Sequence, residues 1–258
     1  MILLLSGTGE GRVLGARLRA AGLPFIASVT TPEARALFAG IEPAPEVCVT
    51  RFTGDSLEKF LRERQVHAIL DATHPFARRI SEHAMQAAAQ LHIGYVRYER
   101  PASDLAAEEG MVQVVPDLAT ATQVCMERGT RIFLTTGANT LNTFRAVIAR
   151  TFVMARILPT VASLTQALEA GLIPAQILAL RGPFSQALEC ALLREYRFDL
   201  LVTKESGAAG GLDGKLAAAA ALQVPAVVVS RPPLQYANLC HDLEEAVRAI
   251  AGVSDGKG

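Results

Sequence analysis

The first two dozen residues constrain the fold of this chain more than any other stretch. An uncharged apolar run, Ile2–Leu5, leads into three alternating glycines, Gly7, Gly9 and Gly11. Such a run is typical of a strand buried in a parallel sheet, and the glycines allow a sharp turn and close approach of a ligand to the backbone. Apolar residues then recur at helical spacing until Gly22, a natural helix stop. The pattern predicts a strand, a glycine-rich turn and a helix whose first N–H groups can hold a phosphate.

The glycine-rich turn departs from the dinucleotide-binding fingerprint. In G-x-G-x-x-G the third glycine would stand at position 12, where the chain has Arg12, and the extra glycine comes one place early at Gly11. A turn of this kind also occurs as a purely structural connection between a strand and a helix. Nucleotide binding and a structural turn therefore both stay open on this motif alone.

The end of the next expected strand, Phe25–Val29, indicates which dinucleotide would bind. An Asp or Glu commonly holds the ribose 2′-hydroxyl of NAD there, whereas this chain offers Ser28, Thr30 and Thr31, with Arg12 as a further candidate. These groups suit a 2′-phosphate and favour NADPH over NADH. Alternatively, Thr30 and Thr31 only cap the following helix.

Three residues follow the expected strand Ala68–Asp71 directly. Thr73, His74 and Pro75 should lie at the carboxyl edge of the sheet, where ligands of open α/β sheets bind, with Pro75 in the first turn of the next helix. We interpret His74 as a cofactor or substrate contact, the alternative being a loop histidine held by the backbone. Further strands are expected near 47–49 and 94–98, and helices from residue 55 and over 77–91.

An acidic stretch without clear periodicity, residues 102–110, indicates a linker, after which strands and helices alternate again. The sequence therefore predicts an α/β protein of two Rossmann-like, doubly wound parallel-sheet domains, residues 1–104 and 105–258, with the active site in the cleft between them. A last helix, about 243–251, could pack on either domain. Strands are expected in the second half near 112–115, 131–134, 152–157, 177–180, 200–203 and 226–229, and helices over 118–128, 185–196 and 212–222.

Polar and cationic residues follow the strands of the second half. Because parallel strands end at one edge, these residues should converge on a crevice that suits carboxylates or phosphates. A single Arg or Lys there is more often a solvated loop charge, but several at equivalent junctions are harder to explain that way. The candidates for contact with an anionic substrate are Thr136, Gly137, Arg181, Gly182, Ser185, Lys204, Ser206, Gly207 and Arg231.

Composition excludes several classes of protein. The 25 basic residues balance 25 acidic ones, so no basic field favours nucleic acid. The four cysteines lie far apart and the histidines show no i,i+4 pairing, which favours reduced core thiols and no metal site. The N-terminal apolar run is too short for a signal peptide or a membrane span, so we expect a cytoplasmic protein.

The motifs of several enzyme classes are missing from the sequence. It contains no nucleophile elbow, no Walker lysine pattern and no H-E-x-x-H, which removes the hydrolase, kinase and metalloprotease interpretations. A cofactor must then carry the chemistry. NADPH on the first domain, facing an anion-binding second domain, describes a reductase in which one acid supplies a proton.

Six short segments stand out in this order along residues 1 to about 235: Gly7–Arg12, Asp71–Ala77, Tyr98–Pro101, Phe133–Gly137, Arg181–Ser185 and Thr203–Gly207. This series resembles the precorrin-6A (cobalt-precorrin-6A) reductases of cobalamin biosynthesis. The resemblance implies NADPH-dependent reduction of one macrocycle double bond of precorrin-6A, giving precorrin-6B, in a two-domain Rossmann-like fold. The implied substrate is a tetrapyrrole bearing acetate and propionate groups, which fits the cationic crevice. Residues 208–211 depart from the polar loop that the family would lead us to expect.

The resemblance and the residues together assign roles. Lys204 is the candidate proton donor, since burial and Arg181 nearby would lower its pKa, although it could equally clamp a carboxylate. The metal-free or cobalt-containing form of the substrate stays open, as do a non-catalytic NADP-binding sensor and a tetrapyrrole carrier. Neighbouring pathway enzymes are the expected transient partners. The expected cofactor-binding residues are Gly7, Thr8, Gly9, Glu10, Gly11, Arg12, Ser28, Thr30, Thr31, Thr73, His74 and Pro75.

Overall fold

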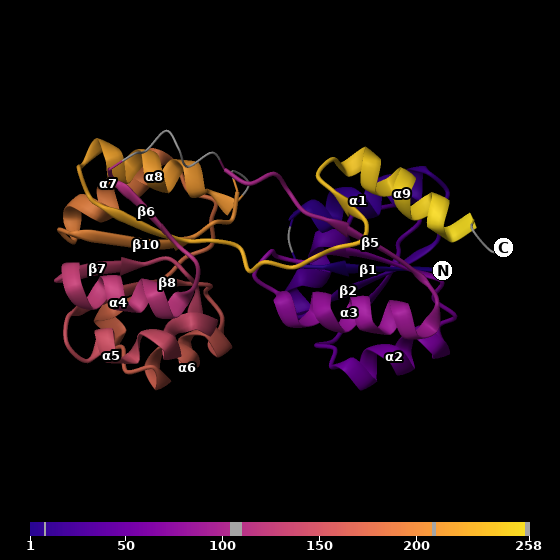
Figure 1. Ribbon diagram of the computed structural model, residues 1–258, viewed down its shortest axis with the longest axis horizontal. Helices are drawn as coiled ribbons and strands as arrows, with labels where there is room; N and C mark the ends of the chain where they lie inside the picture. Colours follow the sequence, from indigo (N-terminus) through magenta and orange to yellow (C-terminus); the bar gives the residue numbers. More distant parts are fainter. Residues whose placement is uncertain (8, 104–109, 208–209, 256–258) are drawn as a thin grey trace. The chain divides into compact units, whose positions relative to one another are not determined.

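The structure, a computed structural model of residues 1–258, describes all residues except 8, 104–109, 208–209 and 256–258. It divides into two compact units (Figure 1). Unit 1 comprises Met1–Pro101 and Pro233–Gly258, and unit 2 comprises Ala102–Pro232. Each unit contains a six-stranded parallel sheet with helices on both faces, which confirms the expected fold class of doubly wound α/β sheets.

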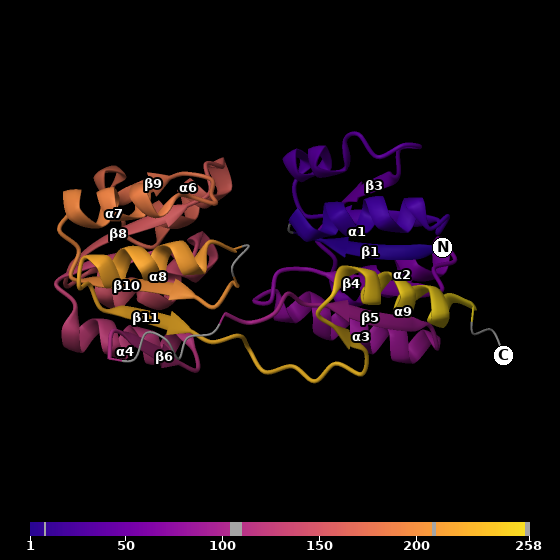
Figure 2. The same cartoon turned by 90° about the horizontal axis from the view of Figure 1, so that it is seen from above.

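In unit 1 the strand order is β12-β5-β4-β1-β2-β3. Helices α1 and α9 cover one face of this sheet, and α2 and α3 cover the other (Figure 1; Figure 2). The elements are β1 Ile2–Ser6, α1 Gly9–Ala20, β2 Phe25–Val29, the 3₁₀ helix η1 Pro32–Phe38, β3 Glu46–Val49, α2 Gly54–Glu63, β4 Ala68–Ala72, α3 Arg78–Leu91, β5 Gly94–Tyr98, β12 Leu239–Cys240 and α9 Leu243–Asp255.

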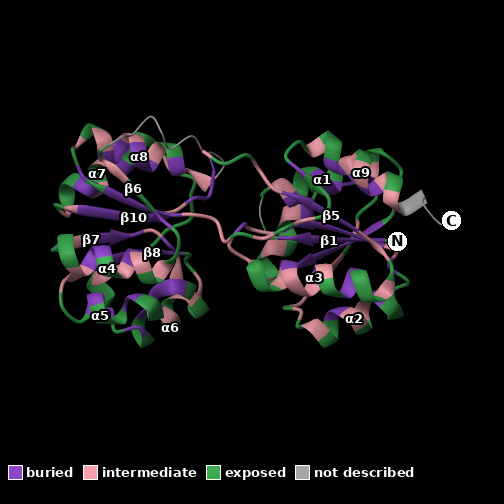
Figure 3. Cartoon of the chain, in the orientation of Figure 1, coloured by how far each residue is buried: buried purple, intermediate pink, exposed green. Residues whose placement is uncertain are grey.

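The core of unit 1 explains the continuous apolar run of β1. Ile2 and Leu4 pack with the α1 and α9 side chains, whereas Leu3 and Leu5 pack with those of α2 and α3. Since both faces of the sheet are covered, every residue of β1 is buried, as Figure 3 shows. A strand of this kind sits in the middle of a doubly wound sheet, and its carboxyl end leads directly into the glycine-rich turn.

In unit 2 the strand order is β6-β11-β10-β7-β8-β9. Helices α7 and α8 pack together over one face of this sheet. The elements are β6 Val112–Val115, α4 Leu118–Arg128, β7 Arg131–Leu134, η3 Ala138–Phe144, α5 Arg145–Ile148, β8 Phe152–Ile157, α6 Val161–Glu169, η4 Pro174–Gln176, β9 Ile177–Ala179, α7 Gln186–Glu195, β10 Leu200–Lys204, α8 Leu212–Ala221 and β11 Ala226–Val229.

The last part of the chain returns to unit 1. Strand β12 pairs in parallel with β5, placing Leu239 beside Arg97 and Cys240 beside Tyr98. Helix α9 then packs against β5 and α1, so the apolar residues Ala246 and Ile250 are buried in the unit 1 core. Residues 233–258 therefore belong with unit 1, whereas the sequence placed 105–258 together and left the packing of the last helix open.

Two local features differ from the sequence prediction. Pro75 is not in the first helical turn, because the N–H of Ala77 donates to the carbonyl of His74 at 2.7 Å and closes a turn before α3 begins at Arg78. The segment after Thr31 is a 3₁₀ helix. Among the described residues no helix is long and apolar enough to cross a membrane.

Candidate functional site

The glycine-rich turn lies at the carboxyl end of β1, and α1 begins at Gly9. The first N–H groups of a helix have no acceptor within the helix, so they are available to an anion. Gly7 and Gly9 are exposed, and a Cβ at either would meet open space. These features fit a phosphate group held by backbone donors. Thr8, also expected to bind the cofactor, lies outside the described residues.

Gly11 has a different role from the other two glycines. It is buried, and a Cβ at this position would overlap the Oγ of Ser6 and lie 2.7 Å from the Ser6 Cβ. The early glycine thus allows α1 to pack closely on the end of β1. Within the described part of the chain the buried Oγ of Ser6 has no hydrogen-bond partner, which leaves a hydroxyl beneath the turn for a ligand.

The residues around the end of β2 are only partly engaged by the protein. Ser28 is buried within the strand, while Thr30 and Arg12 are exposed. The Oγ1 of Thr31 accepts a hydrogen bond from the N–H of Ala34 at 3.4 Å and so caps η1. The capping interpretation therefore holds for Thr31, and Arg12 and Thr30 have side chains exposed at this edge of the sheet.

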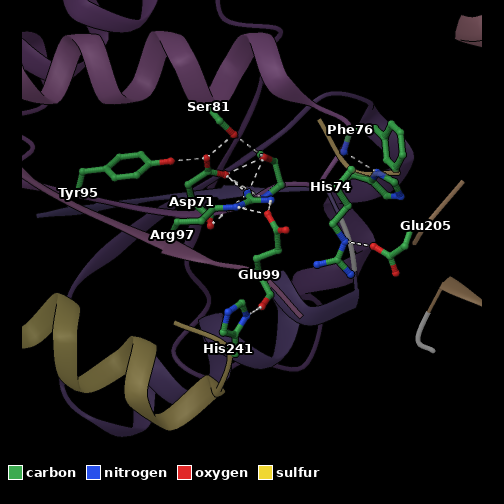
Figure 4. Close-up of polar contacts among 11 residues, drawn as sticks. Asp71, His74, Phe76, Ser81, Tyr95, Arg97, Glu99, Glu205 and His241 are labelled. Atoms are coloured by element: carbon green, nitrogen blue, oxygen red, sulfur yellow. Dashed lines mark hydrogen bonds and ion pairs between the residues drawn. The ribbon is translucent and has the colours of Figure 1, made fainter. Parts of the chain in front are cut away.

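A buried polar network occupies the end of β4 (Figure 4). The parallel register of β4 and β5 places Asp71 beside Arg97, whose Nη1 pairs with Asp71 Oδ1 at 2.9 Å. Asp71 also accepts hydrogen bonds from Ser81 Oγ at 2.7 Å and Tyr95 OH at 2.8 Å. The N–H and hydroxyl of Thr73 donate to the same carboxylate at 3.0 and 2.7 Å. Five donor groups on four residues thus surround one carboxylate and fix the residues that follow β4.

The network has a strong electrostatic effect on its members. Burial by itself would raise the pKa of Asp71, but the guanidinium of Arg97 and hydrogen bonds from Ser81 and Thr73 hold that pKa below its usual range. Burial and the Asp71 carboxylate raise the pKa of Tyr95, which stays a neutral donor. Arg97 also pairs with Glu99 at 3.0 Å. No local pattern in the sequence indicates this network, because Asp71 and Arg97 are brought together only by the pairing of β4 with β5.

His74 and Pro75 lie in the turn after β4. The N–H of Phe76 donates to Nδ1 of His74 at 3.2 Å, so the backbone fixes the His74 ring, as expected if His74 is a loop histidine with a structural role. Pro75 is buried.

A small hollow opens at the carboxyl edge of β1, β4 and β5, on the β4 side of β1. Strand β1 lies between β2 and β4, the position at which strand order reverses and dinucleotides bind in such sheets. The hollow is lined by Glu10, Ala72, Thr73, Pro75, Arg97, Tyr98, Glu99 and Arg100.

In unit 2 the strands β7, β9, β10 and β11 run parallel, so their following residues share one edge of the sheet. Thr136 is buried and accepts a hydrogen bond from Thr140 at 2.8 Å, and Gly137 takes a positive φ of 88°. Ser185 caps α7 through the N–H of Leu188 at 3.3 Å, and Arg181 and Gly182 are exposed. Thr136 and Ser185 thus have structural contacts, while Arg181 presents its charge to solvent.

The loop after β10 contains an acid that the sequence analysis missed. Glu205 is buried, and its Oε1 accepts hydrogen bonds from the N–H groups of Gly207 at 3.0 Å and Ser103 at 3.2 Å. Its other oxygen forms an ion pair with Arg231. Arg231 is therefore partly neutralised by an acid. The Oγ of Ser206 is buried and has no hydrogen-bond partner among the described residues, so this hydroxyl is open to a ligand.

Two lysines of unit 2 have lowered pKa values. Burial lowers the pKa of Lys204, at the end of β10, to about 8, and Arg181 is not a cause, contrary to the sequence expectation. Burial, and then Arg156, lower the pKa of Lys215 to about 8 as well. Lys215 Nζ donates to Thr203 Oγ1 and to the carbonyl of Gly210, each at 3.4 Å. The sequence missed Lys215 because it stands in an alanine-rich helix that indicates only helical propensity.

No group of three or more His, Cys, Asp or Glu residues suitable for a metal ion occurs in the described part of the chain. Two doubly wound parallel sheets, one with a glycine-rich turn at its switch point, define a two-unit Rossmann-like α/β protein. The model of the family "Precorrin-6x reductase CbiJ/CobK" matches residues 1–251. The chain belongs to this family of precorrin-6A reductases, oxidoreductases of cobalamin biosynthesis.

Curated relatives and a solved structure agree with this assignment. The chain is 35% identical over 253 residues to a cobalt-precorrin-6A reductase of Priestia megaterium, covering 97% of this chain and 98% of that protein. It is 38% identical over 253 residues to a precorrin-6A reductase of Rhodococcus erythropolis, covering 98% and 96%. A solved structure described as CobK precorrin-6A reductase is similar with a TM-score of 0.80 and 28% identity, over 98% of this chain and 96% of that one.

Proposed function

We propose that this chain reduces one macrocycle double bond of precorrin-6A with NADPH, giving precorrin-6B and NADP⁺. The hydride from NADPH and one proton from an acid together add two hydrogens across the double bond, so the macrocycle is reduced by two electrons as NADPH is oxidised to NADP⁺. The observation that carries the proposal is the glycine-rich turn at the β1/β4 switch point of unit 1, with no Asp or Glu at the end of β2. We also propose a cytoplasmic location, where NADPH is supplied by metabolism.

In the proposal, unit 1 binds the dinucleotide. The backbone N–H groups of Gly9, Glu10 and Gly11 stand at the start of α1, where the helix dipole favours a phosphate. Arg12 and Thr30 are exposed and suited to a 2′-phosphate, whereas Ser28 is buried in β2, opposite Leu5 of β1. When bound, NADPH supplies the hydride. The chain's contribution is to hold the nicotinamide end beside the residues that follow β4, Thr73–Pro75.

In the proposal, unit 2 binds the carboxylates of the tetrapyrrole. The exposed Arg181 can pair with an acetate or propionate group, and the hydroxyl of Ser206, which has no partner in the described part of the chain, can donate to one. Arg231 contributes less to binding of the substrate carboxylates, because Glu205 already pairs with it. Gly137 and Gly182 stand at the same edge of the sheet, whereas Gly207 is buried and its N–H already donates to Glu205.

Lys204 is the proposed proton donor. A lysine whose pKa is about 8 is still protonated at neutral pH, yet it releases a proton far more readily than an ordinary lysine. The Lys204 ammonium would protonate the carbon next to the one that receives the hydride. The competing role, a carboxylate clamp, predicts a change in substrate affinity alone.

The test is to follow NADPH consumption by absorbance with enzymatically made precorrin-6A and, in parallel, with its cobalt form. Consumption of NADPH with one of them supports the proposal and identifies the natural form of the substrate. Binding of NADPH without turnover with either form would indicate a sensor. Binding of the tetrapyrrole without any need for nicotinamide would indicate a carrier.

A further inference from the structure

An ion pair lies across the start of α1. Glu10, in the first turn of that helix, pairs with Arg100, two residues after β5 ends, with Oε1 and Nη1 3.1 Å apart. The two side chains are 16% and 11% exposed, so both charges are largely withdrawn from water. A carboxylate in the first turn is stabilised by the helix dipole, but it repels any phosphate held at the same helix end.

The same ion pair lines the hollow at the carboxyl edge of unit 1. Glu10 and Arg100 border it together with Thr73 and Pro75, and β1 and β4 run side by side to this point. The neighbouring acid, Glu99, is already paired with Arg97 at 3.0 Å. A phosphate at the N-terminus of α1 would therefore lie beside the guanidinium of Arg100, which the carboxylate of Glu10 holds in position.

We propose that Arg100 is a further cofactor-binding residue, which exchanges the carboxylate of Glu10 for a phosphate of the dinucleotide. This inference rests on the proposed use of NADPH. In the cofactor-free protein Glu10 holds Arg100 at the rim of the hollow, and on binding the guanidinium donates to phosphate oxygens, a geometry that arginine matches well. The released carboxylate turns toward water. Glu10 thus positions Arg100 before binding and opposes the phosphate itself.

Substitutions of the two partners should change the NADPH dissociation constant in opposite directions, and this provides the test. Arg100→Gln removes the charge-assisted contact with the phosphate and should weaken NADPH binding about tenfold, which corresponds to about 1.4 kcal/mol. Glu10→Gln removes the carboxylate that competes with the phosphate for Arg100 and also removes the repulsion, so it should tighten NADPH binding about threefold. The dissociation constant is measured by titrating NADPH into the whole protein, without tetrapyrrole, and Tm is recorded for each variant.

Arg64→Gln is the matched control. Arg64 pairs with Glu46 at 2.8 Å in the same unit, but Arg64 follows α2 and Glu46 begins β3, at the opposite edge of the sheet. This variant loses the same charge and one ion pair, and NADPH binding should stay unchanged. A general effect of net charge would instead weaken binding in Arg64→Gln as much as in Arg100→Gln, which would overturn the inference.

Two further outcomes are decisive. If Glu10→Gln and Arg100→Gln weaken NADPH binding equally and lower Tm equally, the ion pair is only a structural link and the inference is wrong. If wild-type protein binds NADPH but Arg100→Gln binds it as tightly, the inference fails while the proposed function stands. Wild-type protein that binds no NADPH overturns both.

Discussion

Replacing Lys204 by methionine should abolish turnover and stabilise the protein at the same time. Burial lowers the pKa of Lys204 from an ordinary 10.5 to about 8. Each unit of pKa corresponds to about 1.4 kcal/mol, so holding this ammonium in the fold costs about 3 kcal/mol at neutral pH. Methionine has a similar length and no charge. We expect the free energy of unfolding of Lys204→Met to exceed that of wild type by up to this amount at pH 7.

The sign of the pH dependence follows from the lowered pKa. Between pH 8 and 10.5 the unfolded chain holds the Lys204 proton more tightly than the folded one, so the stability of the wild type rises with pH over this interval. The advantage of the methionine variant should therefore shrink from pH 8 upward and vanish near pH 10.5. Urea unfolding followed by circular dichroism at several pH values measures it.

Lys59→Met serves as the control, because Lys59 is an exposed lysine on α2 with a side chain 76% exposed. Its stability should stay within about 0.5 kcal/mol of wild type at every pH. A Lys204→Met variant with no gain in stability, or with a gain that persists unchanged to pH 10.5, would refute the reasoning. In kinetics, a pure rise in the substrate dissociation constant would contradict the proton-donor role and favour the carboxylate clamp.

Three more variants test other parts of unit 1. Asp71→Asn removes one of the two carboxylates that pair with buried Arg97, and Glu99 remains, so we expect the free energy of unfolding in urea to fall by about 3 kcal/mol, the lower end of the range for a broken buried ion pair. The pKa of Asp71 is held below its usual range, so its contribution to wild-type stability should be fully present at neutral pH and should disappear as the pH falls through the lowered pKa. Gly11→Ala should lower Tm through its clash with Ser6, whereas Gly9→Ala, which meets open space, should fold normally when both are compared by thermal unfolding. Arg12→Ala should weaken NADPH binding about tenfold and leave NADH binding unchanged, and an equal loss for both nucleotides would contradict a 2′-phosphate contact.

The sequence allowed much of the fold to be predicted because the strands are continuous apolar runs between turn signals. Residues 25–29 and 94–98 form strands with the expected bounds, and Asp117 caps α4 by accepting the N–H of Thr120 at 2.8 Å. Strand β12 was missed, since a strand of two residues has no periodicity to recognise. The sequence prediction placed residues 105–258 in one domain and left open only the packing of the last helix, because the return of residues 233–258 to unit 1 depends on that strand pairing.

The parts of the candidate site that depend on the sequence pattern of a single segment could be predicted. The parts that depend on contacts between segments far apart in the sequence could not. The glycine-rich turn and the residues at strand ends follow from local pattern. The Asp71–Arg97 ion pair instead depends on the register of β4 with β5. The pairing of Glu205 with Arg231 likewise depends on β10 lying beside β11. Such charges look like ordinary solvated side chains until the topology brings them together.

Transfer of the hydride itself is the most direct test of the account. NADPH carrying deuterium at the transferable position of the nicotinamide is incubated with the protein and precorrin-6A, and the tetrapyrrole product is analysed by mass spectrometry. The account predicts a product containing one deuterium on a macrocycle carbon, with none incorporated when labelled NADPH is replaced by unlabelled NADPH in deuterium-free water. NADPH is labelled in separate experiments on each of the two faces of the nicotinamide C4. A reduced product that contains no deuterium in either experiment would contradict the account.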